Sequence, residues 1–308
     1  MSRSLASESH PNRNEDAVLV DFEHGVAGVF DGMGGHSFGR EASRAAAESV
    51  QRSLMTWNEV TDEDAEGTSV RGSLASLLRT AHRRVIDRGD ELYRDWFLKL
   101  PPAERKKGFK APQTTGVLAL VHEHADGRRT VIVAHAGDSR AWRFGIDGSF
   151  EVLTPDHDLL SDAGERHRLE EKNGTALTDA AVARYRVALD EAAGEADMGD
   201  PLGRELFRNR NVVSSSLGTR TGTPTIDTVV AQLERGDTVL LTTDGIHGNL
   251  TASRMRELAR QAGSADAFVE LLTQEAFAAA HAAPSSYKEG EPMVRRHRDD
   301  MTAVAARI

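Results

Sequence analysis

Short apolar runs of four to eight residues recur along the chain, and they limit its possible folds more than any other feature of the sequence. Their length and their content of valine, isoleucine and leucine are typical of β-strands. The sequence therefore predicts eight or more strands, at 16–22, 25–30, 116–122, 130–136, 141–144, 228–233, 238–243 and 301–308. An Asp-Gly pair within 125–129 separates two of the runs and predicts an antiparallel hairpin there.

Apolar residues at helical spacing predict helices between groups of strands. The spacing is clearest at 39–57 and 266–281, and it is weaker at 70–89, 176–195 and 251–262. Strands in groups, with long helices between the groups, are typical of layered α+β folds.

Composition excludes several classes of protein. The chain has 308 residues, of which 39% are hydrophobic, and this suits one large sheet-containing domain or a closely joined pair. It contains no cysteine, which excludes disulfides, a thiolate metal site and a cysteine nucleophile. A formal net charge of -10 disfavours binding to nucleic acids and anionic membranes. Because the start of the chain lacks a hydrophobic export segment, we expect a cytoplasmic location.

Acidic residues stand at the ends of most of the predicted strands. Asp31 and Asp244 each follow an apolar run and each precede a glycine, which permits a tight turn and exposes its own carbonyl group. The other acids at such positions are Glu15, Asp16, Asp138, Asp299 and Asp300. Carboxylates gathered at one sheet edge would raise each other's pKa, so a divalent cation is expected to hold them ionised. A single Asp-Gly pair is an ordinary turn, but five acidic motifs together indicate a metal-dependent hydrolase with oxygen ligands, which favours Mg²⁺ or Mn²⁺ over Zn²⁺.

The motifs NED, FDGMGGH, TTG, AGDSRAW, LTPDH, SLG, TTDGI and RDDMT occur in an order that resembles the type 2C family of metal-dependent serine/threonine protein phosphatases, in its bacterial form. The similarity runs from about Asn14 to Ile308. It implies an α+β fold, a four-layer αββα sandwich in which helices flank two mostly antiparallel sheets. It also implies that 1–308 is a single phosphatase domain with a flap-like insertion at 157–211.

The resemblance implies a site with two ions, Mn²⁺ or Mg²⁺, and assigns roles to particular acids. Asp31 would bridge both ions, with Glu15 and the carbonyl of Gly32 on one of them. Asp244 and Asp299 would bind the other ion. Asp16 would hydrogen-bond a metal-bound water, Asp138 would help to hold a possible third ion, and Asp300 stands where the family often has asparagine. Together, Asp16, Asp31, Asp244 and Asp299 would form the catalytic set, in which a water bridging the two metals attacks phosphorus in line.

Several positions depart from the family pattern. Pro11 stands where an arginine commonly binds the substrate phosphate, and Arg13 either substitutes for it or is a solvated cation. Met33 replaces a histidine that many eukaryotic members have, and His36 is either a candidate acid or a residue that caps the following helix. Gly248 replaces an acid associated with the third ion, so third-ion binding is doubtful.

Other polar segments are expected to be surface features. The stretches 58–69, 101–112 and 282–300 are predicted to be solvated loops. The basic run Arg295–Arg298 is expected to lie mostly in solvent, although it could attract phosphate to the site. The histidines within 122–124 are expected to be exposed on a strand rather than to bind zinc.

The leading hypothesis is therefore a phosphatase that removes phosphate from serine and threonine in signalling. Its partners would be phosphorylated proteins, including a cognate kinase and the substrates of that kinase. One alternative is a catalytically weak family member that binds a phosphoprotein or regulator. Another is a metal-dependent hydrolase of small phosphate esters. ATP-driven transfer is disfavoured because the sequence lacks a phosphate-binding loop with Gly-Lys-Ser/Thr.

Overall fold

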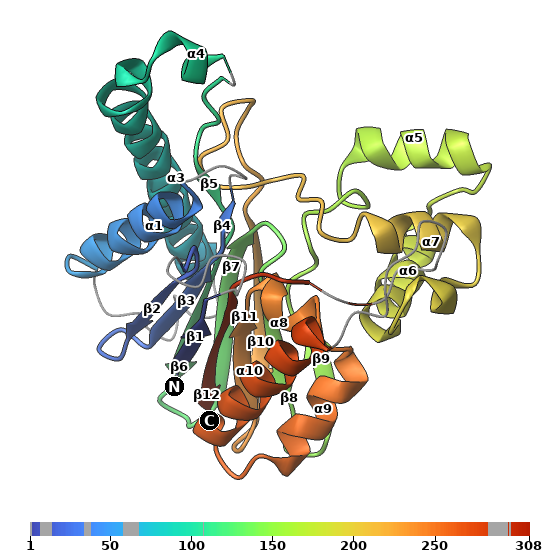
Figure 1. Ribbon diagram of the computed structural model, residues 1–308. Helices are drawn as coiled ribbons and strands as arrows, with labels where there is room; N and C mark the ends of the chain where they lie inside the picture. The colour runs from blue at the N-terminus through green and yellow to red at the C-terminus, as the bar shows by residue number, and fades with distance from the viewer. Residues whose placement is uncertain are drawn as a thin grey trace.

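Two antiparallel five-stranded sheets form the centre of the protein in the computed structural model, which describes residues 2–6, 14–33, 38–57, 68–106, 108–282, 295 and 297–308 (Figure 1). The first sheet has the order β10-β7-β6-β3-β2, and the second has the order β1-β12-β11-β8-β9. The strands of the first sheet are β2 (Ala17–Asp21), β3 (Val26–Phe30), β6 (Gly116–Glu123), β7 (Arg129–Ala136) and β10 (Asp227–Leu233). Those of the second are β1 (Ser2–Leu5), β8 (Arg140–Phe144), β9 (Phe150–Val152), β11 (Thr238–Thr242) and β12 (Met301–Arg307). A short pair, β4 (Gly32–Met33) and β5 (Gln113–Thr114), lies beside them.

Helices cover the outer face of each sheet, as Figure 1 shows. The first sheet is covered by α1 (Gly39–Leu54) and α3 (Thr68–Asp95). The second is covered by α8 (Asp244–His247), α9 (Ala252–Gln261) and α10 (Ala265–His281). The αββα sandwich expected from the sequence is confirmed.

Alternation along the strands explains why the sheets stack. Successive side chains of a strand point to opposite faces, so a strand buried on both faces supplies two cores. In β7, Val131 and Val133 pack between the sheets, whereas Ile132 and Ala134 pack under α1 and α3. The helices present a matching apolar face to the sheet. Along α1, buried residues recur at four-residue intervals, at Ala42, Ala46, Val50 and Leu54.

The segment 157–211 forms a separate helical layer on one side of the sandwich (Figure 1). It contains α5 (Ala163–Asn173), α6 (Asp179–Glu191), the short 3₁₀ helix η2 (Glu195–Met198) and α7 (Pro201–Arg208). Leu169, Tyr185 and Phe207 belong to a small apolar core of its own. We call this segment the flap. Its boundaries, and the assignment of 1–308 to a single domain, stay predictions.

Two surface expectations hold only in part. The stretch 101–112 is not simply a solvated loop, because it contains α4 (Pro102–Arg105) and because Phe109 packs on Phe97 of the 3₁₀ helix η1 (Phe97–Lys99) with ring centroids 5.4 Å apart. His124 is 3% exposed, and its Nε2 lies 2.8 Å from the hydroxyl of Thr130.

Most of 58–69 and of 282–300 lies outside the described residues. None of the helices that the structure describes has both the length and the apolar character needed to cross a bilayer.

Candidate metal centre

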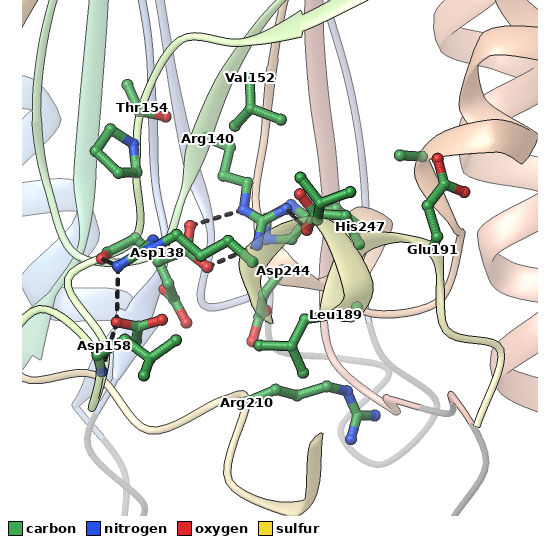
Figure 2. A pocket seen from close by; sticks show the side chains of 18 of the residues that line it. Asp138, Arg140, Val152, Thr154, Asp158, Leu189, Glu191, Arg210, Asp244 and His247 are labelled. Carbon is green, nitrogen blue, oxygen red and sulfur yellow. Dashed lines mark hydrogen bonds and ion pairs between the residues drawn. The ribbon is translucent and has the colours of Figure 1, made fainter. Parts of the chain in front are cut away.

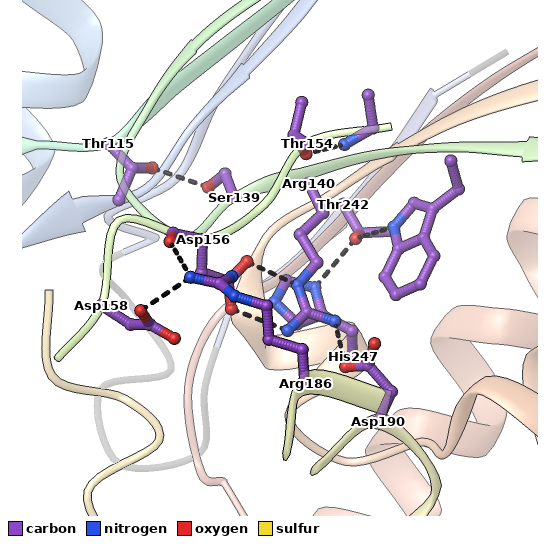
Figure 3. Close-up of polar contacts among 12 residues, drawn as sticks. Thr115, Ser139, Arg140, Thr154, Asp156, Asp158, Arg186, Asp190, Thr242 and His247 are labelled. Carbon is purple, nitrogen blue, oxygen red and sulfur yellow. Dashed lines mark hydrogen bonds and ion pairs between the residues drawn. The ribbon is translucent and has the colours of Figure 1, made fainter. Parts of the chain in front are cut away.

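Asp31 directly follows β3, and hydrogen bonds fix both its backbone N–H and its backbone carbonyl. Its N–H donates to the hydroxyl of Thr115 at 3.0 Å, and its carbonyl accepts from the N–H of Thr115 at 2.8 Å and from the hydroxyl of Thr114 at 2.7 Å. The Thr115 hydroxyl also lies 2.6 Å from that of Ser139, which follows Asp138 (Figure 3). These bonds fix the direction in which the Asp31 side chain leaves the strand.

Glu15 and Gly32 meet where the backbone is unusually close-packed. A Cβ atom built on Gly39 would lie 2.3 Å from the carbonyl oxygen of Gly32 and 3.0 Å from Cδ of Glu15. A Cβ on Gly32 would lie 2.2 Å from the carbonyl oxygen of Gly39. Only glycine fits at these two positions, and their close approach places the Glu15 carboxyl beside the Gly32 carbonyl.

Asp16 and Asp244 are linked through the residue between β11 and α8. The hydroxyl of Thr243 donates to Oδ2 of Asp16 at 2.9 Å, and Asp244 is the first residue of α8. In the same turn of α8, a Cβ atom on Gly245 would lie 1.9 Å from the carbonyl oxygen of Asp300, so α8 can approach the segment before β12 this closely only at a glycine.

Asp299 and Asp300 enter the centre just before β12. Asp300 is 1% exposed, and its Oδ2 accepts the N–H of Glu15 at 2.6 Å. Oδ1 of Asp299 accepts the N–H of Asp300 at 2.8 Å, while its Oδ2 lies 3.0 Å from Nε2 of His297.

His297 is a residue of this centre that the sequence analysis did not identify. Its Nε2 lies 3.0 Å from Oδ2 of Asp244 as well as 3.0 Å from Asp299, and the two carboxylates raise the pKa of His297 to about 11 against the effect of burial. Its placement two residues before Asp299 is the signal that could have found it, because residues i and i+2 of extended chain point to the same side. The expectation that 295–298 lies in solvent is wrong for His297 and for Arg295, although Arg298 is exposed.

The carboxyl groups raise each other's pKa, as crowded acids do. Burial raises the pKa of Asp31 well above its usual range, and the charges of Asp16, Asp244, Asp299 and Asp138 raise it further. Burial is also the main cause of the raised pKa of Asp16 and of Asp138. Burial would raise the pKa of Asp244 too, but the neighbouring His297 outweighs it and holds that pKa well below the usual range. The structure therefore brings five acids from distant parts of the chain into one electrostatic cluster.

The residues present fit a site for hard divalent cations. Oδ1 of Asp16 and Oδ1 of Asp244 are buried, and neither has a hydrogen-bond partner within the described part of the chain. Such oxygens are costly to bury unless a cation or a donor meets them. The donors are carboxylates and a backbone carbonyl, which suit Mg²⁺ and Mn²⁺, and Asp244, His297 and Asp299 offer ligand atoms within 4.8 Å of one another.

A cavity of about 690 Å³ opens beside these acids, between the flap and the second sheet (Figure 2). Asp138, Asp244 and His247 line it from the sandwich, and Leu189 and Arg210 line it from the flap. Arg210 is partly buried, which lowers its pKa, and its guanidinium packs 4.4 Å from the ring centre of Phe207. The sequence analysis did not identify Arg210 as a site residue.

Ion pairs hold the flap against the sandwich, as Figure 3 shows. Arg140 on β8 donates two hydrogen bonds of 2.7 Å to Asp156 and a third of 2.7 Å to Asp190 at the end of α6. Arg295 donates to the carbonyl groups of Ala192 at 2.8 Å and of His247 at 2.6 Å. These contacts therefore fix the flap residues that line the cavity in position next to the acids.

The structure places Glu15, Asp16, Asp31, Gly32, Asp244 and Asp299 of the expected set around one centre, with Asp138 next to Asp244. Their individual roles as ligands stay predictions. Pro11, Arg13 and His36 lie outside the described residues. At Gly248, an added Cβ would lie 2.4 Å from the carbonyl oxygen of Asp244, so an acid at this position would require the backbone to move.

Comparison with known proteins agrees with this geometry. A family model described as protein phosphatase 2C matches residues 7–282. A search of curated proteins found no match. Solved structures with a similar fold include the serine/threonine phosphatase Stp1 from Staphylococcus aureus, at 20% identity and a TM-score of 0.64, covering 100% of this chain and 94% of that one. They also include MsPP, a PPM Ser-Thr phosphatase from Mycobacterium smegmatis solved in complex with cacodylate, at 17% identity and a TM-score of 0.62, covering 100% and 97%.

A third structure of similar fold is PppA, a key regulatory component of T6SS in Pseudomonas aeruginosa, at 19% identity and a TM-score of 0.59, covering 100% of this chain and 96% of that one. At these identities the structures show a shared fold, and the family model, which matches most of the chain, shows the family. The chain therefore belongs to the protein phosphatase 2C family of metal-dependent serine/threonine protein phosphatases.

Proposed function

We propose that the chain hydrolyses phosphoserine and phosphothreonine in proteins at a centre that holds two divalent ions, Mn²⁺ or Mg²⁺. The observation that carries the proposal is the meeting of five acids at one end of the sandwich, two of them with buried oxygens that no described group satisfies. When bound, two such ions supply a nucleophilic water at neutral pH and neutralise charge on the phosphoryl oxygens.

Different residues of the chain would bind the ions and orient the water. Asp31 would bridge the two ions, Glu15 and the Gly32 carbonyl would hold one, and Asp244 and Asp299 would hold the other. Asp16, whose Oδ2 already accepts a hydrogen bond from Thr243, has its Oδ1 available to accept a hydrogen bond from the attacking water. In this position it would orient the water, as a positioned acceptor does in general base catalysis.

We propose two ions rather than three. Asp138 is buried near Asp244, where it could hold a further ion. Gly248, however, supplies no carboxylate, and the Asp244 carbonyl crowds the space that a side chain there would use. A titration that finds three tightly bound Mn²⁺ ions per chain would contradict this part of the proposal.

We further propose that the flap selects the substrate and that Arg210 meets its phosphate. The cavity beside Asp244 is lined by Arg210 from the flap, and it is large enough for side chains next to a phosphorylated residue. Arg13 remains a second candidate for the phosphate. The natural partners would be phosphorylated proteins in the cytoplasm, including a kinase whose action this enzyme reverses.

The experiment compares a phosphothreonine peptide, a phosphoserine peptide, p-nitrophenyl phosphate and ATP as substrates, each with EDTA, Mg²⁺ or Mn²⁺. The proposal predicts turnover of both peptides that requires Mg²⁺ or Mn²⁺ and exceeds the turnover of ATP. Faster hydrolysis of ATP than of the peptides would favour the small-ester alternative. A folded protein that binds a phosphopeptide but turns over none of the substrates would favour the regulatory alternative.

A further inference from the structure

Two strands bring a histidine and an aspartate together on the face of the first sheet, outside the carboxylate centre. His135 on β7 and Asp227 on β10 are directly opposite each other in the antiparallel register. Opposed residues of neighbouring strands point to the same face, with Cβ atoms about 5 Å apart. β10 is an edge strand of this sheet, and the Asp227 side chain is 54% exposed, so the aspartate of the pair is open to solvent.

His157 joins this pair from the loop that follows β9. Its backbone N–H donates to the carbonyl of Gly137 at 3.0 Å, and its Nδ1 accepts the N–H of Gly137 at 3.1 Å. Because Nδ1 accepts a hydrogen bond, the ring proton sits on Nε2, which lies 3.1 Å from Oδ2 of Asp227. The turn is fixed, since Gly137 has φ +103° and a Cβ there would lie 2.7 Å from Thr115.

His135 is the unexplained member of the group. It is 0% exposed, its ring stacks on that of His157 with centroids 4.6 Å apart, and neither of its ring nitrogens has a hydrogen-bond partner among the described residues. Burial lowers the pKa of His135 to about 4, so at neutral pH the ring is uncharged and one of its nitrogens carries a lone pair that can bind a metal ion. A buried polar group without a partner destabilises the folded protein, and a ligand that binds the group would recover this cost.

We propose that His135, His157 and Asp227 form a second metal site, one that binds a single first-row transition ion of the Zn²⁺ class. Each residue offers one ligand atom, and these three atoms lie within 4.8 Å of one another. A tetrahedral zinc ion with bonds of about 2.0–2.2 Å holds its ligand atoms roughly 3.4 Å apart, so the site closes with shifts of about an ångström. The fourth position faces solvent on the Asp227 side.

Binding would exchange a proton for the ion. The ion takes the place of the proton on Nε2 of His157, which is released to solvent, and Oδ2 of Asp227 becomes a ligand instead of an acceptor. The bond from Gly137 to Nδ1 stays in place and orients the His157 ring, as an outer hydrogen bond commonly does for a metal-bound imidazole.

The donor set separates this site from the carboxylate centre. Two imidazoles with one carboxylate favour Zn²⁺, Co²⁺ or Ni²⁺ over Mg²⁺, whereas the carboxylate centre suits Mg²⁺ and Mn²⁺. The two sites are nevertheless joined, since Gly137, which holds His157, directly precedes Asp138. An ion on His157 would therefore stiffen the turn that carries Asp138.

The test counts Zn²⁺ bound by the full chain in excess Mg²⁺, by competition with a chromophoric chelator. All variants carry Asp31→Asn, which weakens binding of Zn²⁺ at the carboxylate centre. We expect one tightly bound Zn²⁺ in this background, and at least a 100-fold weaker affinity after Asp227→Asn or His135→Phe. Asp227 is exposed on an edge strand, so its variant should fold even where His135→Phe does not.

His167→Gln is the matched control, because His167 is an exposed histidine of α5 with Glu171 3.3 Å away and could hold Zn²⁺ at the surface. It should leave the count unchanged. Substitution with Co²⁺ adds a readout of ligand geometry, since a tetrahedral nitrogen-oxygen site gives intense visible absorption. Equal Zn²⁺ affinity in Asp227→Asn and its parent would overturn the proposal, as would loss of the ion in His167→Gln. Neither result depends on turnover, so the proposed phosphatase function stands or falls separately.

Discussion

The backbone N–H of Glu15 donates a 2.6 Å hydrogen bond to Oδ2 of Asp300, although 285 positions separate the two residues. This bond ties the segment before β2 to the segment before β12, and so it connects the acids proposed to hold different ions. A carboxylate that accepts an N–H in this way needs an oxygen at one position and does not need its charge.

Substitution of Asp300 tests that connection. Asparagine keeps an oxygen that can accept the N–H of Glu15, whereas alanine removes it. We expect Asp300→Ala to raise the Mn²⁺ concentration for half-maximal activity about 10-fold or more, as the loss of an outer partner does at other metal sites. Asp300→Asn should stay within about threefold of the wild type. Equal effects of the two variants would show that the charge, and not the hydrogen bond, is what matters.

Arg210 is predicted to bind the substrate phosphate from the flap. We expect Arg210→Gln to raise KM for a phosphothreonine peptide about 10-fold or more, the loss of a hydrogen bond to a charged group, with a smaller change in kcat. Arg210→Lys should recover part of the effect because it keeps the charge. The neighbour Arg208, whose Nε donates to the Arg204 carbonyl at 3.3 Å, is the control, and Arg208→Gln should leave KM unchanged. A fall in kcat at constant KM would contradict a binding role.

The pairing of Arg140 with Asp156 and Asp190 is predicted to hold the flap in place. Arg140→Met leaves the buried carboxylate of Asp156 and the partly buried carboxylate of Asp190 without their cation, and it should lower the free energy of unfolding by about 3 kcal/mol or more in urea titrations. Arg166→Met is the control, since its partner Asp179 is 99% exposed and the pair should contribute less than about 1 kcal/mol. Similar losses in the two variants would show that the buried pairing has no special role.

His247 gives a prediction about pH. Thr242 accepts the indole N–H of Trp142 at 2.9 Å, and its hydroxyl proton is available for Nδ1 of His247, which lies 2.9 Å away; the neutral ring can accept it. Burial lowers the pKa of His247 to about 3, while the unfolded chain takes up this proton near pH 6.5. The unfolded state therefore binds more protons below pH 6.5, and stability falls with falling pH in that range by up to about 1.4 kcal/mol per pH unit.

His247→Gln keeps an acceptor for the Thr242 hydroxyl and removes the titration. The difference in unfolding free energy between the wild type and this variant should shrink, or reverse in favour of the variant, from pH 6.5 to pH 4.5. Parallel stability curves over that interval would show that His247 titrates normally in the folded protein.

The sequence predicted the parts of the fold that depend on apolar pattern. The eight predicted strands correspond to β2, β3, β6, β7, β8, β10, β11 and β12, and the two clearest helices correspond to α1 and α10. Strands β1 and β9 were missed because "SRSL" and "FEV" are short and carry polar residues. Their structure comes from pairing with β12 and β8 rather than from their own composition.

Prediction of the candidate site was limited in a similar way. The acids could be found because each stands at the end of a recognisable strand, as Asp31 and Asp244 do. Arg210 could not, since it lies in no periodic segment and its approach to Asp244 depends on how the flap folds back over the site. For His297 the only sequence signal is its spacing of two residues from Asp299, and its contact with Asp244 depends on how the segment before β12 folds. The burial of Arg295 was also missed, because its partners are backbone carbonyls, which a sequence does not distinguish.

The most direct test of the two-ion account is hydrolysis of a phosphothreonine peptide by the wild type and by Asp31→Asn, each with EDTA, Mg²⁺ or Mn²⁺. Asp126→Asn, the same change at an exposed hairpin turn, is the control. The account predicts turnover that needs Mg²⁺ or Mn²⁺, that is lost by at least 100-fold in Asp31→Asn and that is unchanged in Asp126→Asn. Equal metal-dependent turnover by folded Asp31→Asn and the wild type would contradict it.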